Sequence, residues 1–193
     1  LGWYEGMKEV ASQHDFQLVG GETASLPGDG ALISIAMTGE VSPGRCVKRS
    51  GAVVGDLILV TGRLGDSFAS GRHLTFTPRL PEAAWLVENH RPSAMMDLSD
   101  GVGSDLPRLA RASGIGYTVA MDRIPCHEGA TTGQAVSDGE DYELLFTIPP
   151  EKTESLIAAW AGFFPDLPLT VIGEMTEDTP VELAHGWQHY HSA

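Results

Sequence analysis

The sequence of 193 residues contains only two cysteines, Cys46 and Cys126, and their spacing matches no metal-ligand motif. Because structural disulfides are rare in reducing compartments, we expect a cytoplasmic protein whose two thiols remain free. The sequence also lacks any apolar run of about 18 residues, the length that a membrane-spanning helix requires, and it shows no signal-peptide pattern. We therefore expect no contact with a membrane.

Positive charge is scarce along the chain. There are 12 Lys and Arg against 26 Asp and Glu, the formal net charge is -14, and the longest basic cluster is the pair Lys48-Arg49. Binding to a nucleic-acid backbone depends on clustered Lys and Arg, so we expect no nucleic-acid partner. A ligand that is itself anionic would need a divalent metal ion to neutralise both sides.

Two common motifs for zinc-dependent and serine-dependent hydrolysis are missing as well. The seven histidines lie mostly in polar stretches, and neither HExxH nor GxSxG occurs. We therefore assign no catalytic nucleophile or general base. By contrast, hydrophobic residues make up 42% of the chain and charged residues 20%, which is typical of a folded globular protein rather than a disordered one.

Apolar periodicity predicts an α/β (α+β) fold with a mixed sheet flanked by helices, because helices and strands alternate without a strict βαβ rhythm. Helices are expected over about residues 3–15, 66–74, 78–89 and 151–163, and between Asp100 and Gly114. Strands are expected at 16–19, 31–41, 57–61, 117–121, 142–148, 169–172 and 181–183, and in a segment that ends at Asp97. The last long helix is expected to bury one stripe: Leu156, Ile157, Trp160 and Ala161.

A segment rich in Gly, Pro and Ser divides the chain. Residues 42–56 read SPGRCVKRSGAVVGD, which predicts a linker or a ligand-facing loop. We set the domain boundary here, so that residues 1–41 form the end of one domain and residues 42–193 form a second. The chain opens directly on an amphipathic helix pattern without an initiator Met, so we expect the sequence to begin inside a longer protein. One face of that helix is apolar: Trp3, Met7, Val10 and Ala11.

The stretch MMDLSDG ends an apolar run with two carboxylates, Asp97 and Asp100. A strand that ends here and turns into a helix would point both acids out of the sheet edge where open α/β sheets bind ligands. Carboxylate oxygens at such an edge suit Mg²⁺, which takes one or two carboxylates together with substrate phosphates. Alternatively, Asp100 or Ser104 simply caps the helix and Asp97 sits in a turn.

Two further segments carry acids beside glycine. In GEDYEL, which begins at Gly139, three acids precede a strand, and such like charges repel unless cations or donors meet them. Solvated acids at an exposed strand end are the alternative. In Gly20-Gly21-Glu22-Thr23 the glycines permit close approach of a ligand, and Glu22 can contact a metal ion or a ribose. A plain turn explains that tetrapeptide equally well.

A cation and an aromatic residue complete the candidate set. Arg49, in the loop Arg49-Ser50-Gly51, offers a guanidinium for phosphate binding, or it is an ordinary surface arginine. Tyr190, in the closing segment GWQHY, either packs in the tail or provides a flat stacking surface for a ring.

The order of these motifs resembles the thiamine-monophosphate kinase family. LVGGET, RSGA-x-x-GD, D-x-SDG, GEDYEL and GWQHY follow one another, and the resemblance covers essentially all 193 residues. This family belongs to a superfamily that also contains aminoimidazole ribonucleotide synthetase and selenophosphate synthetase. The resemblance implies an N-terminal ATP-binding domain that forms a homodimer and a C-terminal α/β domain that closes over it. Residues 1–41 would be the end of the first and residues 42–193 the second.

The resemblance also implies roles for single residues. Asp97 and Asp100 would bind Mg²⁺, and so would Glu22, at a position where the family usually has Asp. Four residues would contact ATP: Gly21, Glu22, Arg49 and Ser99. Two would contact the thiamine substrate: Glu140 and, by stacking, Tyr190.

The implied reaction is the phosphorylation of thiamine monophosphate by ATP, assisted by Mg²⁺, to thiamine diphosphate. The attacking phosphate oxygen is already ionised at neutral pH, so no general base is required. The family's N-terminal acidic metal motifs are not in this sequence, and we therefore expect these residues alone to lack kinase activity. Two other functions stay open: a ligase like aminoimidazole ribonucleotide synthetase, and a non-catalytic nucleotide- or thiamine-binding module.

Overall fold

The computed structural model describes residues 2–179 and residue 183 of the chain. The chain separates into two compact units, Leu1–Glu40 and Val41–Ala193, and each is described by itself. All strands among the described residues belong to the second unit. The assignment of the first unit to an ATP-binding domain remains a prediction.

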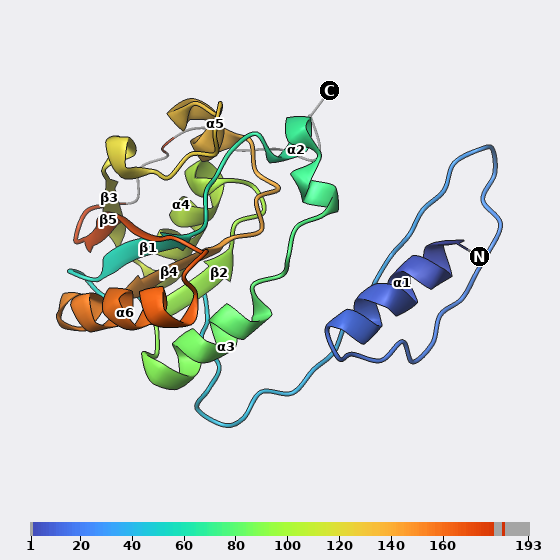
Figure 1. The fold of residues 1–193 in the computed structure, drawn as a ribbon, viewed down its shortest axis with the longest axis horizontal. Helices are drawn as coiled ribbons and strands as arrows, with labels where there is room; N and C mark the ends of the chain where they lie inside the picture. The colour runs from blue at the N-terminus through green and yellow to red at the C-terminus, as the bar shows by residue number, and fades with distance from the viewer. Residues whose placement is uncertain (1, 180–182, 184–193) are drawn as a thin grey trace. The chain divides into compact units, whose positions relative to one another are not determined.

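The first unit contains one helix, α1 (Gly2–Gln13), followed by irregular chain (Figure 1). Within residues 2–40 only Ala11 is buried, and Trp3 is 62% exposed. The strands predicted at 16–19 and 31–41 are wrong, because neither segment forms strand structure. A strand needs a neighbouring strand to bond its N–H and C=O groups, and residues 2–40 supply none.

The second unit is built on a five-stranded sheet (Figure 1). The strands are β1 (Leu57–Thr61), β2 (Ala94–Asp97), β3 (Gly116–Val119), β4 (Leu144–Ile148) and β5 (Leu169–Thr176). Their order is β2-β4-β1-β5-β3, and every pairing between them is antiparallel. The predicted sheet with flanking helices is therefore confirmed, but it is antiparallel rather than mixed. β1, β2 and β3 run in one direction, and β4 and β5 lie between them in the other.

Helices cover both faces of this sheet and enclose two hydrophobic clusters. On one face lie α4 (Val102–Ser113) and the short α5 (Thr132–Ser137), and on the other lie α3 (Leu80–Asn89) and α6 (Pro150–Phe163) (Figure 1). Side chains alternate along β1 accordingly, since a strand points successive residues to opposite faces. Ile58 and Val60 join the cluster under α4, and Leu59 joins the cluster under α3 and α6.

Two helix predictions need correction. The helix expected over 66–74 is interrupted at Gly71, whose φ of 79° is left-handed, and it becomes α2 (Ser67–Ser70) and the 3₁₀ turn η1 (Arg72–Leu74). In α6, Leu156 and Trp160 are buried as predicted, but Ile157 is 39% exposed and Ala161 is exposed. The α6 stripe is thus narrower than the sequence predicted.

Three smaller features complete the second unit. The helix α5 was not predicted; it begins with a reciprocal cap between Thr131 and Gln134. A second 3₁₀ turn, η2 (Met121–Arg123), follows β3. The strand predicted at 181–183 lies largely outside the described residues. No helix in the described part of the chain combines the length and the apolar character needed to cross a membrane.

Candidate functional site

Two loops of the second unit lie side by side where β2 ends and β4 begins. We call residues 98–101 the SDG loop and residues 139–143 the GEDYE loop. The Glu140 N–H donates to the Ser99 carbonyl at 2.8 Å, and the Tyr142 N–H donates to the Leu98 carbonyl at 2.8 Å. The antiparallel register, which sets Asp97 opposite Leu144, enforces this proximity. The structure therefore brings the predicted residues Ser99 and Glu140 together.

Glycine is required where the two loops touch. A Cβ built on Gly139, whose φ is 69°, would lie 2.7 Å from the Ser99 carbonyl oxygen. A Cβ on Gly101, whose φ is 88°, would lie 2.6 Å from the Val136 carbonyl oxygen. Both positions combine a left-handed backbone with close approach of another chain segment, so only glycine fits.

Replacing Gly139 with Ala should destabilise the second unit more than replacing Gly129 does. Both glycines have positive φ, 69° and 84°, but a Cβ on Gly129 meets nothing within 4 Å. The backbone strain shared by both variants costs about 1–2 kcal/mol, and the Gly139 variant adds the clash with the SDG loop. Urea denaturation measures the two free energies of unfolding. Equal losses would contradict the close contact between the loops.

The GEDYE loop holds two side chains in an unusual backbone conformation. Glu140 and Tyr142 have φ values of 58° and 52°, in the left-handed region that residues other than glycine seldom adopt. The loop is held there by neighbouring groups: the Ser67 hydroxyl donates to the Glu140 carbonyl at 2.6 Å, and the Tyr142 hydroxyl donates to Glu140 Oε2 at 2.9 Å. Strain of this kind concentrates at ligand-binding sites.

Three predicted carboxylates affect the pKa of Tyr142. Its pKa is raised to about 12, first by burial, then by its hydrogen bond to Glu140 and by the negative charges of Glu140, Asp97 and Asp100. The hydrogen bonds between the SDG loop and the GEDYE loop place these acids at one edge of the sheet. We call the acids of MMDLSDG and of GEDYEL at this edge the electronegative site.

The start of α4 corrects the cap prediction. Gly101 occupies the N-cap position, so the expectation that Asp100 or Ser104 occupies it is wrong. Asp105, whose side chain is fully buried, instead accepts the N–H groups of Ser99 at 3.0 Å and of Asp100 at 2.9 Å. Burial raises the pKa of Asp105, and the Asp100 N–H together with Arg108 opposes the shift.

Sequence reasoning missed both Asp105 and Arg108. Asp105 belongs to no recognised sequence motif. Its place in the first turn of α4 was the only available signal, because acids are favoured near the N-terminus of a helix. Arg108 follows three residues later, and it pairs with Asp105 and with Asp100. Together they shape the SDG loop from the side of the helix.

The donor set at this edge fits Mg²⁺ bound in an open manner. Asp97 is exposed at the end of β2, and the Asp100 side chain is 14% exposed. Among the described residues, no three His, Cys, Asp or Glu side chains converge to hold a metal ion. Two carboxylates without a closed cage suit an ion that completes its shell with water and phosphate oxygens.

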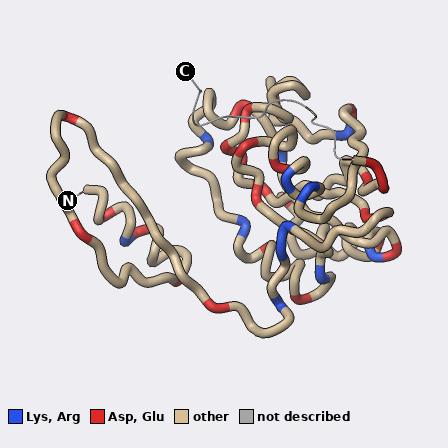
Figure 2. The backbone as a smooth tube through the Cα atoms, turned by 180° about the vertical axis from the view of Figure 1, so that it is seen from behind, with Lys and Arg blue, Asp and Glu red and all other residues tan. Residues whose placement is uncertain are grey.

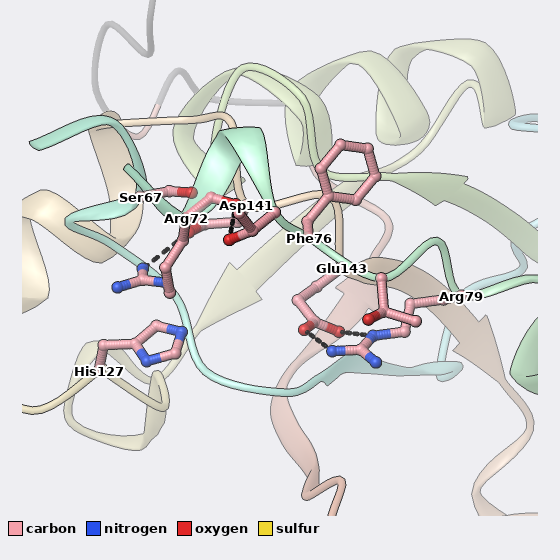
Figure 3. Close-up of a pocket in the computed structure, with 9 residues that line it drawn as sticks. Ser67, Arg72, Phe76, Arg79, His127, Asp141 and Glu143 are labelled. Atoms are coloured by element: carbon pink, nitrogen blue, oxygen red, sulfur yellow. Dashed lines mark hydrogen bonds and ion pairs between the residues drawn. The ribbon is translucent and has the colours of Figure 1, made fainter. Parts of the chain in front are cut away.

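A pocket of about 140 Å³ lies beside the GEDYE loop (Figure 3). Glu143, whose side chain is 7% exposed, accepts hydrogen bonds from Arg79 at 2.6 and 2.9 Å and from the Thr61 hydroxyl at 2.6 Å. The sequence did not predict this pocket, because its walls come from distant segments. All but one of the residues that line it are polar or charged: Ser67, Arg72, Thr75, Phe76, Thr77, Arg79, His127, Asp141 and Glu143.

Asp141 is the most strongly perturbed acid in this pocket. Its side chain is 2% exposed, and it accepts the Gly65 N–H at 3.0 and 3.1 Å, with Arg72 at 3.8 Å. Burial raises its pKa to about 7, against the opposing effects of the Gly65 N–H and Arg72. In the same pocket, burial and the charge of Arg72 lower the pKa of His127.

Acidic and basic residues are interspersed along the backbone of the second unit (Figure 2).

The raised pKa predicts a pH dependence that Asp141→Asn removes. Between the ordinary value of 3.8 and about 7, the folded state holds a proton that the unfolded chain does not. That proton stabilises the fold at about pH 5, and the stabilisation is lost as pH rises through about 7. The unfolding free energy of the unaltered chain, minus that of the variant, should therefore fall with rising pH, by at most about 1.4 kcal/mol per unit. A flat difference from about pH 5 to about pH 8, measured by urea denaturation, would contradict the shift.

The predicted residue Arg49 lies beside the last residue of α4. Ser113, the last residue of α4, accepts the Gly51 and Ala52 N–H groups at 3.2 Å and donates to the Arg49 carbonyl at 3.4 Å. Arg49 is therefore near the C-terminal end of α4, and the carbonyl of the preceding residue, Lys48, accepts the Met95 N–H of β2 at 3.0 Å. Gly21 and Glu22 belong to the first unit, and Tyr190 lies outside the described residues.

Comparison with known proteins identifies the family. The C-terminal domain of AIR synthase related protein matches residues 53–186. A thiamine-monophosphate kinase of Halobacterium salinarum is 32% identical, over 95% of this chain and 69% of the relative. The chain belongs to the thiamine-monophosphate kinase family. The resemblance read from the motifs is thereby confirmed.

Two further members of the thiamine-monophosphate kinase family show how much of it the chain covers. The Salmonella typhimurium relative is 34% identical over 91% of this chain and 62% of its own length. A solved structure of the Aquifex aeolicus enzyme, complexed with AMPPCP and TMP, is 28% identical with a TM-score of 0.56, over 75% of this chain and 54% of that chain. The chain thus spans about 60% of the length of the curated relatives it matches.

Proposed function

We propose that the polypeptide carrying this sequence transfers a phosphoryl group from ATP to thiamine monophosphate, giving thiamine diphosphate and ADP. The observation that carries the proposal is the pairing of the SDG loop with the GEDYE loop, which brings the acids that follow β2 and the acids that precede β4 to one edge of the sheet. Relatives named thiamine-monophosphate kinase support the reaction, and the Aquifex aeolicus structure with AMPPCP and TMP supports both substrates. Because the chain spans about 60% of those relatives, the activity is proposed for the full family length.

The electronegative site divides into a nucleotide part and a substrate part. We assign Asp97 and Asp100 to Mg²⁺, and by the family resemblance we propose Glu22 as a Mg²⁺ ligand as well. Bound Mg²⁺ would neutralise phosphate charge and hold the reacting groups in line. Contacts to ATP are proposed for four residues: Gly21, Glu22, Arg49 and Ser99.

The substrate part lies at the GEDYE loop. Glu140 is proposed to contact thiamine, whose thiazolium ring is cationic and therefore suited to a carboxylate. The neighbouring Tyr142 ring stacks on Phe76, with centroids 4.2 Å apart and planes inclined by 24°, so flat side chains already line this place. Tyr190 is proposed to stack on the substrate as well.

The chain's own residues have few chemical tasks in this reaction. The attacking phosphate oxygen is ionised at neutral pH, so no side chain needs to remove a proton. Asp105 orients the SDG loop through the Ser99 and Asp100 N–H groups, and the GEDYE loop holds Glu140 against it. Positioning and charge stabilisation account for most of catalysis in phosphoryl transfer.

Three broader statements belong to the same proposal. The full-length protein forms a homodimer. It acts in the cytoplasm, where Cys46 and Cys126 remain free thiols. These 193 residues alone have no appreciable kinase activity. Sedimentation of the full-length protein tests the first statement. Assay of the isolated chain tests the last, and ATP-dependent formation of thiamine diphosphate by it would refute that statement.

Calorimetry on the full-length protein separates the proposal from its alternatives. Thiamine monophosphate and a non-hydrolysable ATP analogue are titrated with and without Mg²⁺, alongside a formylglycinamidine ribonucleotide. We expect the unaltered protein to bind thiamine monophosphate and the ATP analogue only when Mg²⁺ is present. The Glu140→Gln variant should bind thiamine monophosphate about tenfold more weakly, a loss of about 1.4 kcal/mol. Tight binding of the ribonucleotide instead would overturn the proposal in favour of a ligase.

A further inference from the structure

Arg108 pairs with two carboxylates of the site at once. Its Nη1 donates to Asp105 Oδ1 at 2.8 Å and also to Asp100 Oδ2. The three side chains differ in exposure: Arg108 is 44% exposed, Asp100 14% and Asp105 0%. The partly exposed guanidinium therefore contacts two carboxylates that are mostly or fully buried.

The local charge explains why a cation is needed at this place. Asp100 follows Ser99, whose carbonyl accepts the Glu140 N–H at 2.8 Å, and β2 ends at Asp97 three residues earlier, so Asp100 lies among acids of both loops. A mostly buried carboxylate among like charges is costly unless a positive group faces it. In the structure that positive group is Arg108, whose own pKa the hydrogen bond to Asp100 raises.

The two partners of Arg108 do different work. Asp105 accepts the N–H groups of Ser99 and Asp100, so it fixes the main chain of the SDG loop whatever the Asp100 carboxylate binds. The Asp100 Oδ2 atom points instead to a guanidinium whose side chain is almost half exposed. Such a side chain can shift away from Asp100 at small cost while it stays on Asp105, because almost half of its surface already lies in water.

We propose that Arg108 is a positioning residue that holds the Asp100 carboxylate in the cation-free site and competes with the divalent cation for it. The proposal rests on the proposed function in one respect, the assignment of Asp100 as a cation ligand. A carboxylate oxygen shared with a guanidinium offers less charge to a metal ion, and the two positive groups repel each other. The cation therefore displaces Arg108 from Asp100, while Arg108 retains Asp105.

A purely structural role for Arg108 predicts the opposite sign. If the guanidinium only braced the SDG loop, its removal would loosen Asp100 and weaken cation binding. Competition predicts that removal strengthens cation binding, because the carboxylate no longer has a resident partner. The sign of the change in affinity therefore decides between the two roles.

The experiment measures Mn²⁺ binding to the 193-residue chain by electron paramagnetic resonance, without nucleotide. Arg108→Gln should bind Mn²⁺ several-fold more tightly than the unaltered chain, and Arg108→Lys, which keeps the charge, should stay within about twofold, less than about 0.4 kcal/mol. Arg111→Gln is the matched control, because Arg111 is an exposed arginine of the same helix. Equal or weaker binding by Arg108→Gln overturns the proposal.

A further variant separates failure of this inference from failure of the metal assignment. Asp100→Asn should weaken Mn²⁺ binding and abolish the gain made by Arg108→Gln. If Asp100→Asn leaves the affinity unchanged, Asp100 is not a cation ligand, and both the assignment and the inference fall. If it weakens binding while Arg108→Gln gives no gain, only the inference falls.

The unaltered chain offers a second measurement that needs no variant. Binding and displacement are reciprocal, so a cation that competes with Arg108 must loosen the guanidinium. Nuclear magnetic resonance should show faster hydrogen exchange of the Arg108 guanidinium when Mg²⁺ is added, with the Arg111 signals unchanged. Unchanged or slower exchange of Arg108 overturns the proposal even if Arg108→Gln fails to fold.

Discussion

Replacing Glu143 with Ala is expected to lower the free energy of unfolding of the second unit by about 3–5 kcal/mol, because it breaks a buried ion pair from one side. Glu143 is 7% exposed, and it accepts two hydrogen bonds from Arg79 and one from the Thr61 hydroxyl. Its removal leaves the Arg79 charge, 21% exposed, without its main partner. Domains are stable by only about 5–15 kcal/mol, so this loss is large.

Urea denaturation followed by circular dichroism measures this effect, with Arg45→Ala as the matched control. Arg45 pairs with Glu88 at 3.5 Å, but the two side chains are 39% and 67% exposed. Exposed pairs contribute about 0–1 kcal/mol, so the control should change little. A loss below about 1 kcal/mol for Glu143→Ala would show that the pair does not stabilise the fold.

Asp97→Asn is expected to reduce Mg²⁺-dependent phosphorylation of thiamine monophosphate by the full-length protein at least about a hundredfold, or about 2.7 kcal/mol of transition-state stabilisation. The amide keeps the shape of the side chain but removes the charge that a hard cation requires. Asp97 is exposed at the end of β2, so the substitution should leave the fold intact.

Asp122→Asn is the control for this variant, because Asp122 is an exposed acid of η2. Release of ADP, measured over a range of Mg²⁺ concentrations, should be unchanged in the control. Nearly normal turnover of Asp97→Asn at every Mg²⁺ concentration would remove Asp97 from the metal site and weaken the assignment of the whole edge.

Local patterns predicted most elements of the second unit. The strand 57–61 forms with the predicted bounds, because an unbroken apolar run ended by glycine has few other solutions. α6 also forms after Pro149, since proline in the first turn and an apolar stripe both favour a helix. Sequence patterns of this kind work where the interactions that stabilise an element are close in the chain.

The pairing of strands that are distant in the chain could not be predicted from local patterns. The mixed sheet was wrong because the positions of β4 and β5 between the earlier strands depend on long-range packing rather than on any local pattern. The strands at 16–19 and 31–41 have apolar, β-branched sequences, yet they form no sheet in residues 2–40. Strand propensity shows that the side chains of a segment suit a sheet, but it does not show whether another strand is available to pair with that segment.

The candidate site was predictable in its residue types and less so in its assembly. Asp97, Asp100 and Glu140 were chosen from acids beside glycine, and the structure brings them to one edge of the sheet. Arg49 was chosen as a guanidinium in a loop that suits phosphate binding, and its backbone lies near the C-terminal end of α4. Asp105 and Arg108 escaped notice because a buried carboxylate that accepts loop N–H groups looks, in sequence, like any helical acid.

The most direct test of the account is the identity of the product that the full-length protein makes from ATP. The protein is incubated with ATP, Mg²⁺ and either thiamine monophosphate or a formylglycinamidine ribonucleotide, and the products are separated by chromatography. We expect thiamine diphosphate and ADP in equal amounts, dependent on Mg²⁺, and no turnover of the ribonucleotide. Formation of an aminoimidazole ribonucleotide without thiamine diphosphate would contradict it.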